Sequence, residues 1–283
     1  MKSFFDYPLT IIINSIESLG KYFLLIFLTF KSINQWKQNL TNILNQMIVI
    51  GIKSIPIVIF TSLFSGMVAG LQAAYQFDVD TGFPITKEAI QYLGSVVGTS
   101  VVLELGPMIT ALVMTGKIGA TICAEIGTMR ITEQIDALES LSFNPIAYLV
   151  MPRILAAIIM FPYLVIISDI FGITGGLVAS TYAYEPLTVT MFFQGLEIYG
   201  HIETDSIVGL VKGLFFGFSI TSIACYKGYY AKGGASGVGK ATTETVVVSC
   251  ITVVILDYVL AAILLWLKLK IYINHLVRMK FLK

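Results

Sequence analysis

Long apolar runs are the feature that most constrains this chain of 283 residues. Several segments of at least about 20 residues are apolar enough to cross a hydrocarbon core of about 30 Å. With 56% hydrophobic and 12% charged residues, the chain carries more apolar surface than a soluble domain of this size can bury. The sequence therefore predicts an all-α integral membrane protein with about five transmembrane helices. The predicted spans run near residues 47–75, 89–116, 146–180, 206–226 and 245–267.

The N-terminal region has a weaker apolar pattern. Apolar residues recur at helical spacing within residues 8–34, but Asn14, Glu17 and Lys21 interrupt the run. A helix that lies in the membrane interface is therefore favoured over a sixth span. No small-residue cleavage site follows an apolar run near the N-terminus, so a removable signal peptide is not expected. The predicted division is an N-terminal interfacial helix region, a transmembrane domain and a basic C-terminal tail, at residues 1–44, 45–268 and 269–283.

Basic residues in short connections predict the orientation, because they are enriched on the cytoplasmic side. They gather before the first span and in the second and fourth connections, whereas residues 181–205 contain four acidic residues and no lysine or arginine. An odd number of spans places the basic tail on the other side of the membrane, where we expect it to lie on anionic headgroups.

The stretch GASGVGKAT at residues 234–242 lies one residue away from the phosphate-binding pattern G-x-x-x-x-G-K-[ST]. Ala241 stands where a hydroxyl should coordinate Mg²⁺, and both flanks look like spanning helices instead of a strand and a soluble helix. Glycine accepts positive φ without a Cβ clash. We therefore predict a hairpin loop here and no nucleotide-binding site in this chain.

Catalytic or metal chemistry is not expected either. The three cysteines and two histidines are scattered without pairing or ligand spacing. A membrane enzyme would need a nucleophile with a base, or clustered histidines and carboxylates, and the sequence offers no such constellation. The sequence therefore predicts no catalytic residue and no metal site.

Glu104 falls near the middle of the second predicted span, where a charged carboxylate costs about 2.5–3.5 kcal/mol. Two interpretations stay open for it: a hydrogen-bonded glutamate that fixes helix packing, and a polar group that lines a substrate path.

Other charges lie in or near spans. Lys53 and Lys212 are expected to snorkel to an interface, and Asp257 to join helices.

The connection after the second span has the pattern of a short helix over residues 125–141. Ile131, Ile135 and Leu138 lie on one side of it among polar neighbours. A solvated surface helix explains this pattern. A helix that lies between two spans, and on which a soluble partner protein pushes, explains the same pattern equally well.

Several motifs occur together in this region and beyond it. They are ELGP at Glu104–Pro107, AEIGTMRITEQIDAL at Ala124–Leu138, the pairs Asn144–Pro145 and Pro152–Arg153, and KGGASGVGKATT at Lys232–Thr243. Together they resemble the signature of the MlaE family of ABC transporter permeases.

The resemblance covers roughly residues 45–268, which would then form a permease domain. It implies one half of a homodimer that carries phospholipids or other lipids between membranes of a diderm envelope. A separate soluble ABC ATPase would bind ATP and Mg, and a lipid-binding MCE-domain protein would sit on the opposite side. No cofactor in this chain and no nucleic-acid partner are implied. The implied location is the inner membrane of a diderm bacterium, with the plastid inner envelope as the second option.

The resemblance also implies roles for particular residues. Glu104 would face the central lipid cavity, and Lys227 would sit near its cytoplasmic end. The segment from Glu125 to Leu141 would be the coupling helix seated in the ATPase, with five polar contacts: Glu125, Arg130, Glu133, Asp136 and Glu139.

Three side chains at the outer end of the first span are candidates for the cavity wall, and ordinary helix packing explains each of them equally well. They are Leu71, Tyr75 and Phe77. The alternative function is an ATP-independent secondary transporter of an amphipathic substrate. Such a carrier would need paired ionisable residues at mid-membrane in two similar halves, and the sequence shows no internal repeat.

Overall fold

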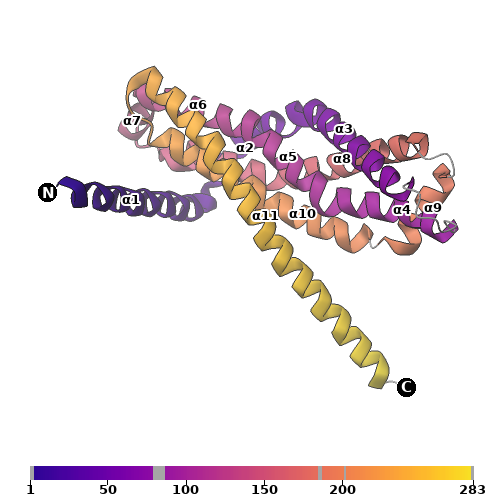
Figure 1. Cartoon of the computed structure of the whole chain (residues 1–283). Coiled ribbons are helices and arrows are strands. Elements are labelled where there is room, and N and C mark those ends of the chain that lie inside the picture. Colours follow the sequence, from indigo (N-terminus) through magenta and orange to yellow (C-terminus); the bar gives the residue numbers. More distant parts are fainter. Residues whose placement is uncertain (1–2, 79–86, 184–186, 201, 282–283) are drawn as a thin grey trace. The chain divides into compact units, whose positions relative to one another are not determined.

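The computed structural model describes residues 3–78, 87–183, 187–200 and 202–281, and all regular structure in these ranges is helical (Figure 1). Five helical stretches in these ranges are long and apolar enough to cross a membrane, which confirms the predicted all-α membrane fold. They are Leu40–Gln76, Gln91–Ile131, Ile146–Ala183, Ile202–Tyr229 and Gly234–Leu264.

The α-helices that build these stretches are α1 (Ser3–Lys31), α2 (Leu40–Ile50), α3 (Ile55–Asp78), α4 (Lys87–Ser100), α5 (Gly106–Met114), α6 (Ala120–Ile131), α7 (Gln134–Ser140), α8 (Met151–Ala183), α9 (Val189–Tyr199), α10 (Ile202–Tyr229) and α11 (Gly234–Phe281). Short 3₁₀-helices lie at η1 (Ser32–Gln35) and η2 (Ile52–Ser54), and π-helical segments at η3 (Val101–Leu105), η4 (Thr115–Gly119) and η5 (Ile146–Val150).

The chain divides into two compact units, and α8, α10 and α11 supply residues to both. The first unit combines Met1–Ile50, Thr115–Ala157 and Phe218–Ser249. The second unit combines Gly51–Met114, Ile158–Gly217 and Cys250–Lys283.

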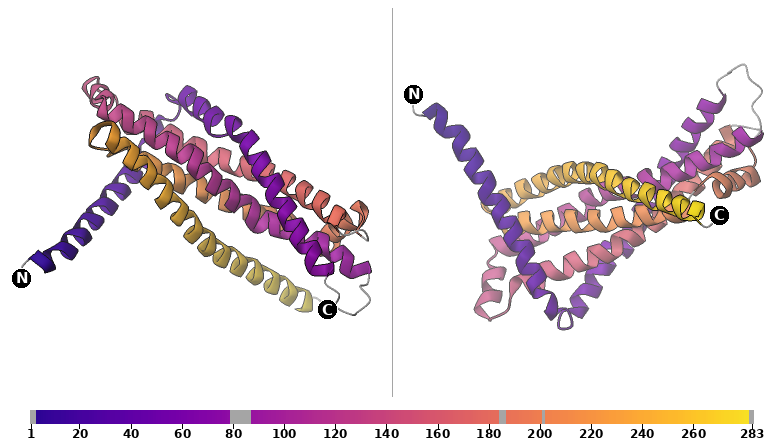
Figure 2. Two further views of the ribbon diagram at one scale, coloured as in Figure 1. Left: turned by 45° about the horizontal axis from the view of Figure 1, so that its top comes forward. Right: turned by 90° about the horizontal axis from the view of Figure 1, so that it is seen from below.

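Glycines let α3 and α8 approach closely in the second unit, where the two helices lie side by side (Figure 2). A Cβ atom on Gly66 would lie 1.9 Å from the carbonyl oxygen of Gly172, and one on Gly70 would lie 2.4 Å from that of Gly176. Both helices thus repeat a small residue every fourth position, the pattern that lets membrane helices pack backbone to backbone.

Gly66→Ala should therefore lower the free energy of unfolding by about 1–3 kcal/mol, the usual cost of overpacking a close contact. Thermal unfolding in detergent measures the effect. Gly20→Ala is the matched control, because no atom lies within 4 Å of a Cβ placed on Gly20 in α1. Equal melting temperatures for the two variants would show that the α3–α8 contact is looser than described.

α9 is a helix that the sequence did not predict, since residues 181–205 were interpreted as a connection. At 11 residues it is too short to span a membrane. The hydroxyl of Thr188 accepts a hydrogen bond from the backbone N–H of Met191 at 3.3 Å and caps its N-terminus. α9 packs closely against α4, where a Cβ atom on Gly195 would lie 1.7 Å from the carbonyl oxygen of Gln91.

The helix predicted near the N-terminus is present as α1, which packs on α10 within the first unit. The Tyr22 hydroxyl and the Ser222 hydroxyl are 2.8 Å apart, and the rings of Phe30 and Phe218 have centroids 6.2 Å apart. Burial raises the pKa of Tyr22. Among the described residues, α1 is not one of the five candidate spans, and its placement in the membrane interface stays a prediction.

GASGVGKAT is the start of α11, so the prediction of a hairpin loop at residues 234–242 is wrong. The chain reverses over residues 230–233 alone. Gly233 and Gly234 have φ values of +92° and +66°, so two adjacent glycines make the turn and leave the next residues free to begin a helix. The stretch also follows helix α10 instead of a strand, which removes the structural context of a phosphate loop.

Candidate functional site

Pro107 leaves a backbone acceptor without its helical donor in the second span. Proline has no N–H, so the carbonyl group of Leu103, four residues earlier, loses its usual partner. Leu103 and Glu104 also lie in the π-helical segment η3, a type of helix irregularity that is frequent at functional sites. Lys212 on α10 donates a hydrogen bond to the Leu103 carbonyl oxygen at 3.0 Å. The ELGP motif thus leaves a carbonyl oxygen without its helical donor, and the ammonium group of Lys212 from another helix donates a hydrogen bond to it.

Lys212 also joins two carboxylates from two further helices of the second unit. Its Nζ donates to Glu104 Oε2 at 2.8 Å and lies 2.9 Å from Asp257 Oδ1 on α11, outside hydrogen-bond geometry. The Lys212 side chain is 1% exposed, that of Asp257 14% and that of Glu104 47%. We call these three residues the charged triad.

The expectation that Lys212 snorkels to an interface is wrong. An ammonium group without partners inside a span is costly, and Lys212 finds its partners within the protein instead of at a membrane surface. Asp257 joins helices, as expected from the sequence. The sequence indicated Glu104 as a deep charge but did not bring the triad together, because 108 residues separate Glu104 from Lys212.

The triad leaves one group available to a ligand. Lys212 is fully enclosed and Asp257 nearly so, whereas close to half of the Glu104 side chain is exposed. A carboxylate that is fixed by an ammonium group and still accessible can accept hydrogen bonds from a polar head group. The Glu104 side chain thus holds helices together and also presents an acceptor, and its place in a substrate path stays a prediction.

A second buried carboxylate lies close to the ELGP motif. Asp169 on α8 is 8% exposed, and its Oδ1 has no hydrogen-bond partner among the described residues. A Cβ atom on Gly106 would lie 2.0 Å from this oxygen, and the neighbouring Ser168 hydroxyl donates to the Gly106 carbonyl oxygen at 3.2 Å. Glycine at position 106 is thus required by the approach of α8.

Two of the three predicted wall residues on α3 have exposed side chains. Leu71 is 47% exposed and Tyr75 is 72% exposed, so packing inside the chain does not account for them. The side chain of Phe77 lies outside the described residues. A role in a lipid path stays a prediction for all three.

Lys227 is paired near the turn between α10 and α11. Its Nζ donates to Glu244 Oε2 at 2.7 Å within the first unit. The side chain is 28% exposed, so this ion pair ties the two helices together while leaving part of the ammonium group accessible.

The predicted helix over residues 125–141 is two helices, α6 and α7, and the prediction of one continuous helix is wrong. Glu133 separates them with a φ of +59°, a left-handed conformation that a non-glycine residue rarely adopts. Glu125 lies near the end of the second span and accepts a hydrogen bond from Arg153 at 2.9 Å. Arg130 donates to Asp136 across the break at 2.7 Å.

The surface around α7 combines acidic and apolar side chains. Glu133, Asp136 and Glu139 are exposed, and so are Leu141 and Phe143, at 69% and 58%. A hollow of about 270 Å³ lies beside α7, and Leu138 and Tyr148 contribute to its lining. An exposed surface of this composition is typical of a protein contact. We call it the α7 surface.

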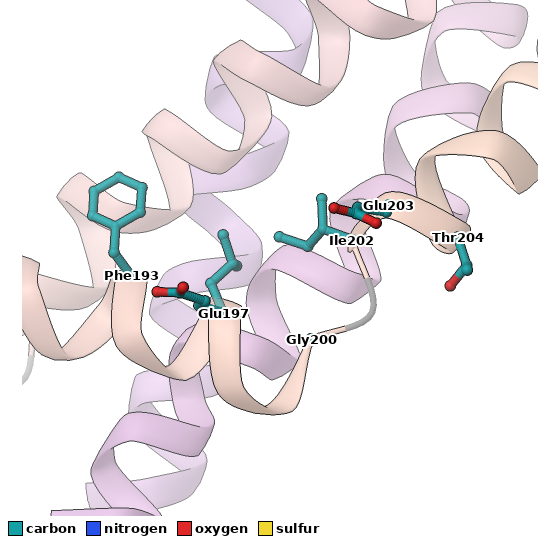
Figure 3. A pocket seen from close by; sticks show the side chains of 7 residues that line it. Phe193, Glu197, Gly200, Ile202, Glu203 and Thr204 are labelled. Carbon is teal, nitrogen blue, oxygen red and sulfur yellow. The ribbon is translucent and has the colours of Figure 1, made fainter.

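A different pocket, of about 490 Å³, lies where α9 ends and α10 begins (Figure 3). Glu197 and Glu203 contribute carboxylates to its lining, and Phe193 contributes an aromatic ring. The pocket contains none of the predicted site residues. It is a second candidate for binding, but acidic side chains alone do not define a ligand.

Comparison with known proteins assigns the chain to a family. The family described as Permease MlaE matches residues 43–263. A probable ABC transporter permease protein of Rickettsia typhi is 42% identical over 251 residues, which are 88% of this chain and 92% of that protein. The chain belongs to the MlaE permease family. It is therefore a multi-pass ABC transporter permease, as the sequence motifs predicted.

Two further relatives have a similar extent. A probable ABC transporter permease protein of Synechocystis is 38% identical over 245 residues, covering 87% of this chain and 90% of that protein. The intermembrane phospholipid transport system permease protein MlaE of Haemophilus influenzae is 31% identical over 256 residues, covering 89% of this chain and 94% of that protein.

Proposed function

We propose that this chain is the permease subunit of an ABC transporter that moves phospholipid between the membranes of a diderm envelope. The observation that carries the proposal is the charged triad, which holds the half-exposed Glu104 inside a membrane span. A lipid path needs apolar walls for acyl chains and few polar groups for the head. The relative from Haemophilus influenzae, named for phospholipid transport, supports this choice of substrate.

A homodimer would complete the lipid path. α3 and α11 expose many apolar side chains, among them Phe64, Val68, Ile251 and Ile255. In a membrane such faces contact either lipid or protein. A second copy placed against them would create a cavity between the two chains, with Leu71, Tyr75 and Phe77 on its wall and Lys227 near its cytoplasmic end.

A separate ATPase would bind ATP and Mg and drive the transport. The α7 surface is its proposed docking site, because exposed carboxylates and apolar side chains lie together there. An MCE-domain protein would receive or deliver lipid on the opposite side. The proposed location is the inner membrane of a diderm bacterium.

Purification of the chain from its own membranes in mild detergent tests the proposal. We expect a complex with two copies of this chain, a nucleotide-binding subunit and an MCE-domain protein, with phospholipid in the mass spectrum of the extracted complex. Glu133→Lys with Asp136→Lys should reduce the yield of the nucleotide-binding subunit, because charge reversal replaces attraction with repulsion. A monodisperse chain without such a subunit would instead favour the ATP-independent carrier.

A further inference from the structure

α9 presents an exposed face that combines apolar and acidic side chains in the second unit. Val189, Phe193 and Glu197 are all exposed, and their four-residue spacing places them on one side of the helix. Phe193 and Glu197 border the pocket of about 490 Å³, and Glu203 of α10 borders the same pocket (Figure 3). We call Val189, Phe193, Glu197 and Glu203 the α9–α10 face.

The two carboxylates of the α9–α10 face have no partner within the ranges that the structure describes. Neither Glu197 nor Glu203 takes part there in a hydrogen bond or an ion pair. Residues 181–205 contain no lysine or arginine that could pair with them locally. Exposed apolar side chains beside unpaired charges of one sign are typical of a contact with a segment of the opposite charge.

The end of α11 supplies that opposite charge. Residues 268–283 contain no acidic residue and five basic residues, which are Lys268, Lys270, Arg278, Lys280 and Lys283. The apolar span ends at Leu264, and the helix continues to Phe281, about 26 Å further. α11 therefore carries a concentrated positive charge beyond the apolar core. We call residues 268–283 the basic end.

The α9–α10 face and the basic end lie on the same side of the membrane. α10 and α11 are consecutive spans, so they cross in opposite directions, and α10 starts on the side where α11 ends. Lys212 and Asp257, 2.9 Å apart in the second unit, mark one level on both helices. About 14 Å of helix separates Lys212 from Glu203. An equal length of α11 leads from Asp257 to Trp266, so the basic end begins near the level of the α9–α10 face.

The occupant that fits this geometry is a second copy of the chain. Near this level α11 is exposed, with Tyr258 at 76%, so its own chain leaves it open to a partner. We propose that the basic end of α11 binds the α9–α10 face of a second copy. The inference rests on the proposed function, in which two copies meet through α3 and α11. A two-fold axis along the membrane normal keeps the levels of both copies equal, so each basic end meets the other copy's face.

Charge exchange tests this contact in the full-length chain. Lys268→Glu with Lys270→Glu should raise the dissociation constant of the dimer about three- to tenfold in detergent at low salt, the range of two exposed ion pairs. Adding Glu197→Lys with Glu203→Lys exchanges the signs and should restore the constant to within about twofold of the original. Light scattering over a dilution series measures the constant.

Lys31→Glu with Lys37→Glu is the matched control, because it reverses two exposed lysines of the first unit and should leave the constant unchanged. A dimer that ignores the reversal at Lys268 and Lys270 would overturn the inference, since the basic end would then bind lipid headgroups or its own chain. A weakened dimer that the exchanged signs do not restore would overturn it as well. An unaltered chain that stays monomeric at every concentration would refute the proposed homodimer, and the inference with it.

Discussion

Lys212→Met is expected to lower the free energy of unfolding by about 3 kcal/mol. The substitution removes a cation that is 1% exposed. It leaves the Glu104 and Asp257 carboxylates without their ion-pair partner and the Leu103 carbonyl oxygen without its donor. Breaking a buried ion pair costs about 3–5 kcal/mol, and the low end applies because Glu104 is half exposed and partly screened. Chemical unfolding in detergent micelles measures the difference.

Two further variants separate lost charge pairing from lost packing. Lys240→Met changes an exposed lysine of α11 and should leave stability within about 0.5 kcal/mol of the unaltered protein. Adding Glu104→Gln and Asp257→Asn to Lys212→Met removes the unpaired negative charges and should restore more than half of the loss. A Lys212→Met protein as stable as the original would show that Lys212 is not paired in the membrane.

Glu104→Leu should reduce lipid transfer per ATP about tenfold or more while the protein still folds. Lys212 keeps its contacts with Asp257 and the Leu103 carbonyl oxygen, so helix packing survives. What is lost is the accessible acceptor, and hydrogen bonds to charged groups contribute about 1.5–3 kcal/mol. Glu104→Gln retains an acceptor without the charge and should show an intermediate loss.

Transfer of a fluorescent phospholipid between vesicles, measured beside thermal stability, distinguishes the two roles of Glu104. Glu17→Gln, at an exposed glutamate of α1, is the control and should transfer normally. Normal transfer by a stable Glu104→Leu protein would remove Glu104 from the lipid path. A large loss of stability would instead assign it to packing alone.

The five spans could be predicted from the sequence because each depends on local apolar content. Their ends could not, since polar residues continue the helices beyond the apolar core. The second span extends to Ile131, and α11 begins at Gly234 within a glycine-rich stretch that suggested a loop. In both places the backbone hydrogen bonds of a helix outweigh the low helix propensity of single residues.

The site was predicted only in part. Glu104 is conspicuous because an acid is rare inside an apolar run. Lys212, however, was expected at a membrane interface, and the sequence named no partner for Asp257. Only the packing of α10 and α11 against the second span brings them together. The break at Glu133 was also hidden, because Thr132 and Glu133 carry no proline or glycine signal. A left-handed conformation at a glutamate is imposed by its surroundings and not by the local sequence.

ATP-dependent transfer of phospholipid by the reconstituted complex tests the central claim most directly. Proteoliposomes with the complex would be mixed with acceptor vesicles, and transfer would be followed with and without ATP and with and without a proton gradient. The permease proposal predicts transfer that requires ATP, stops when the ATPase subunit is omitted, and ignores the gradient. Transfer that follows the gradient in the absence of ATP and of the ATPase would contradict it.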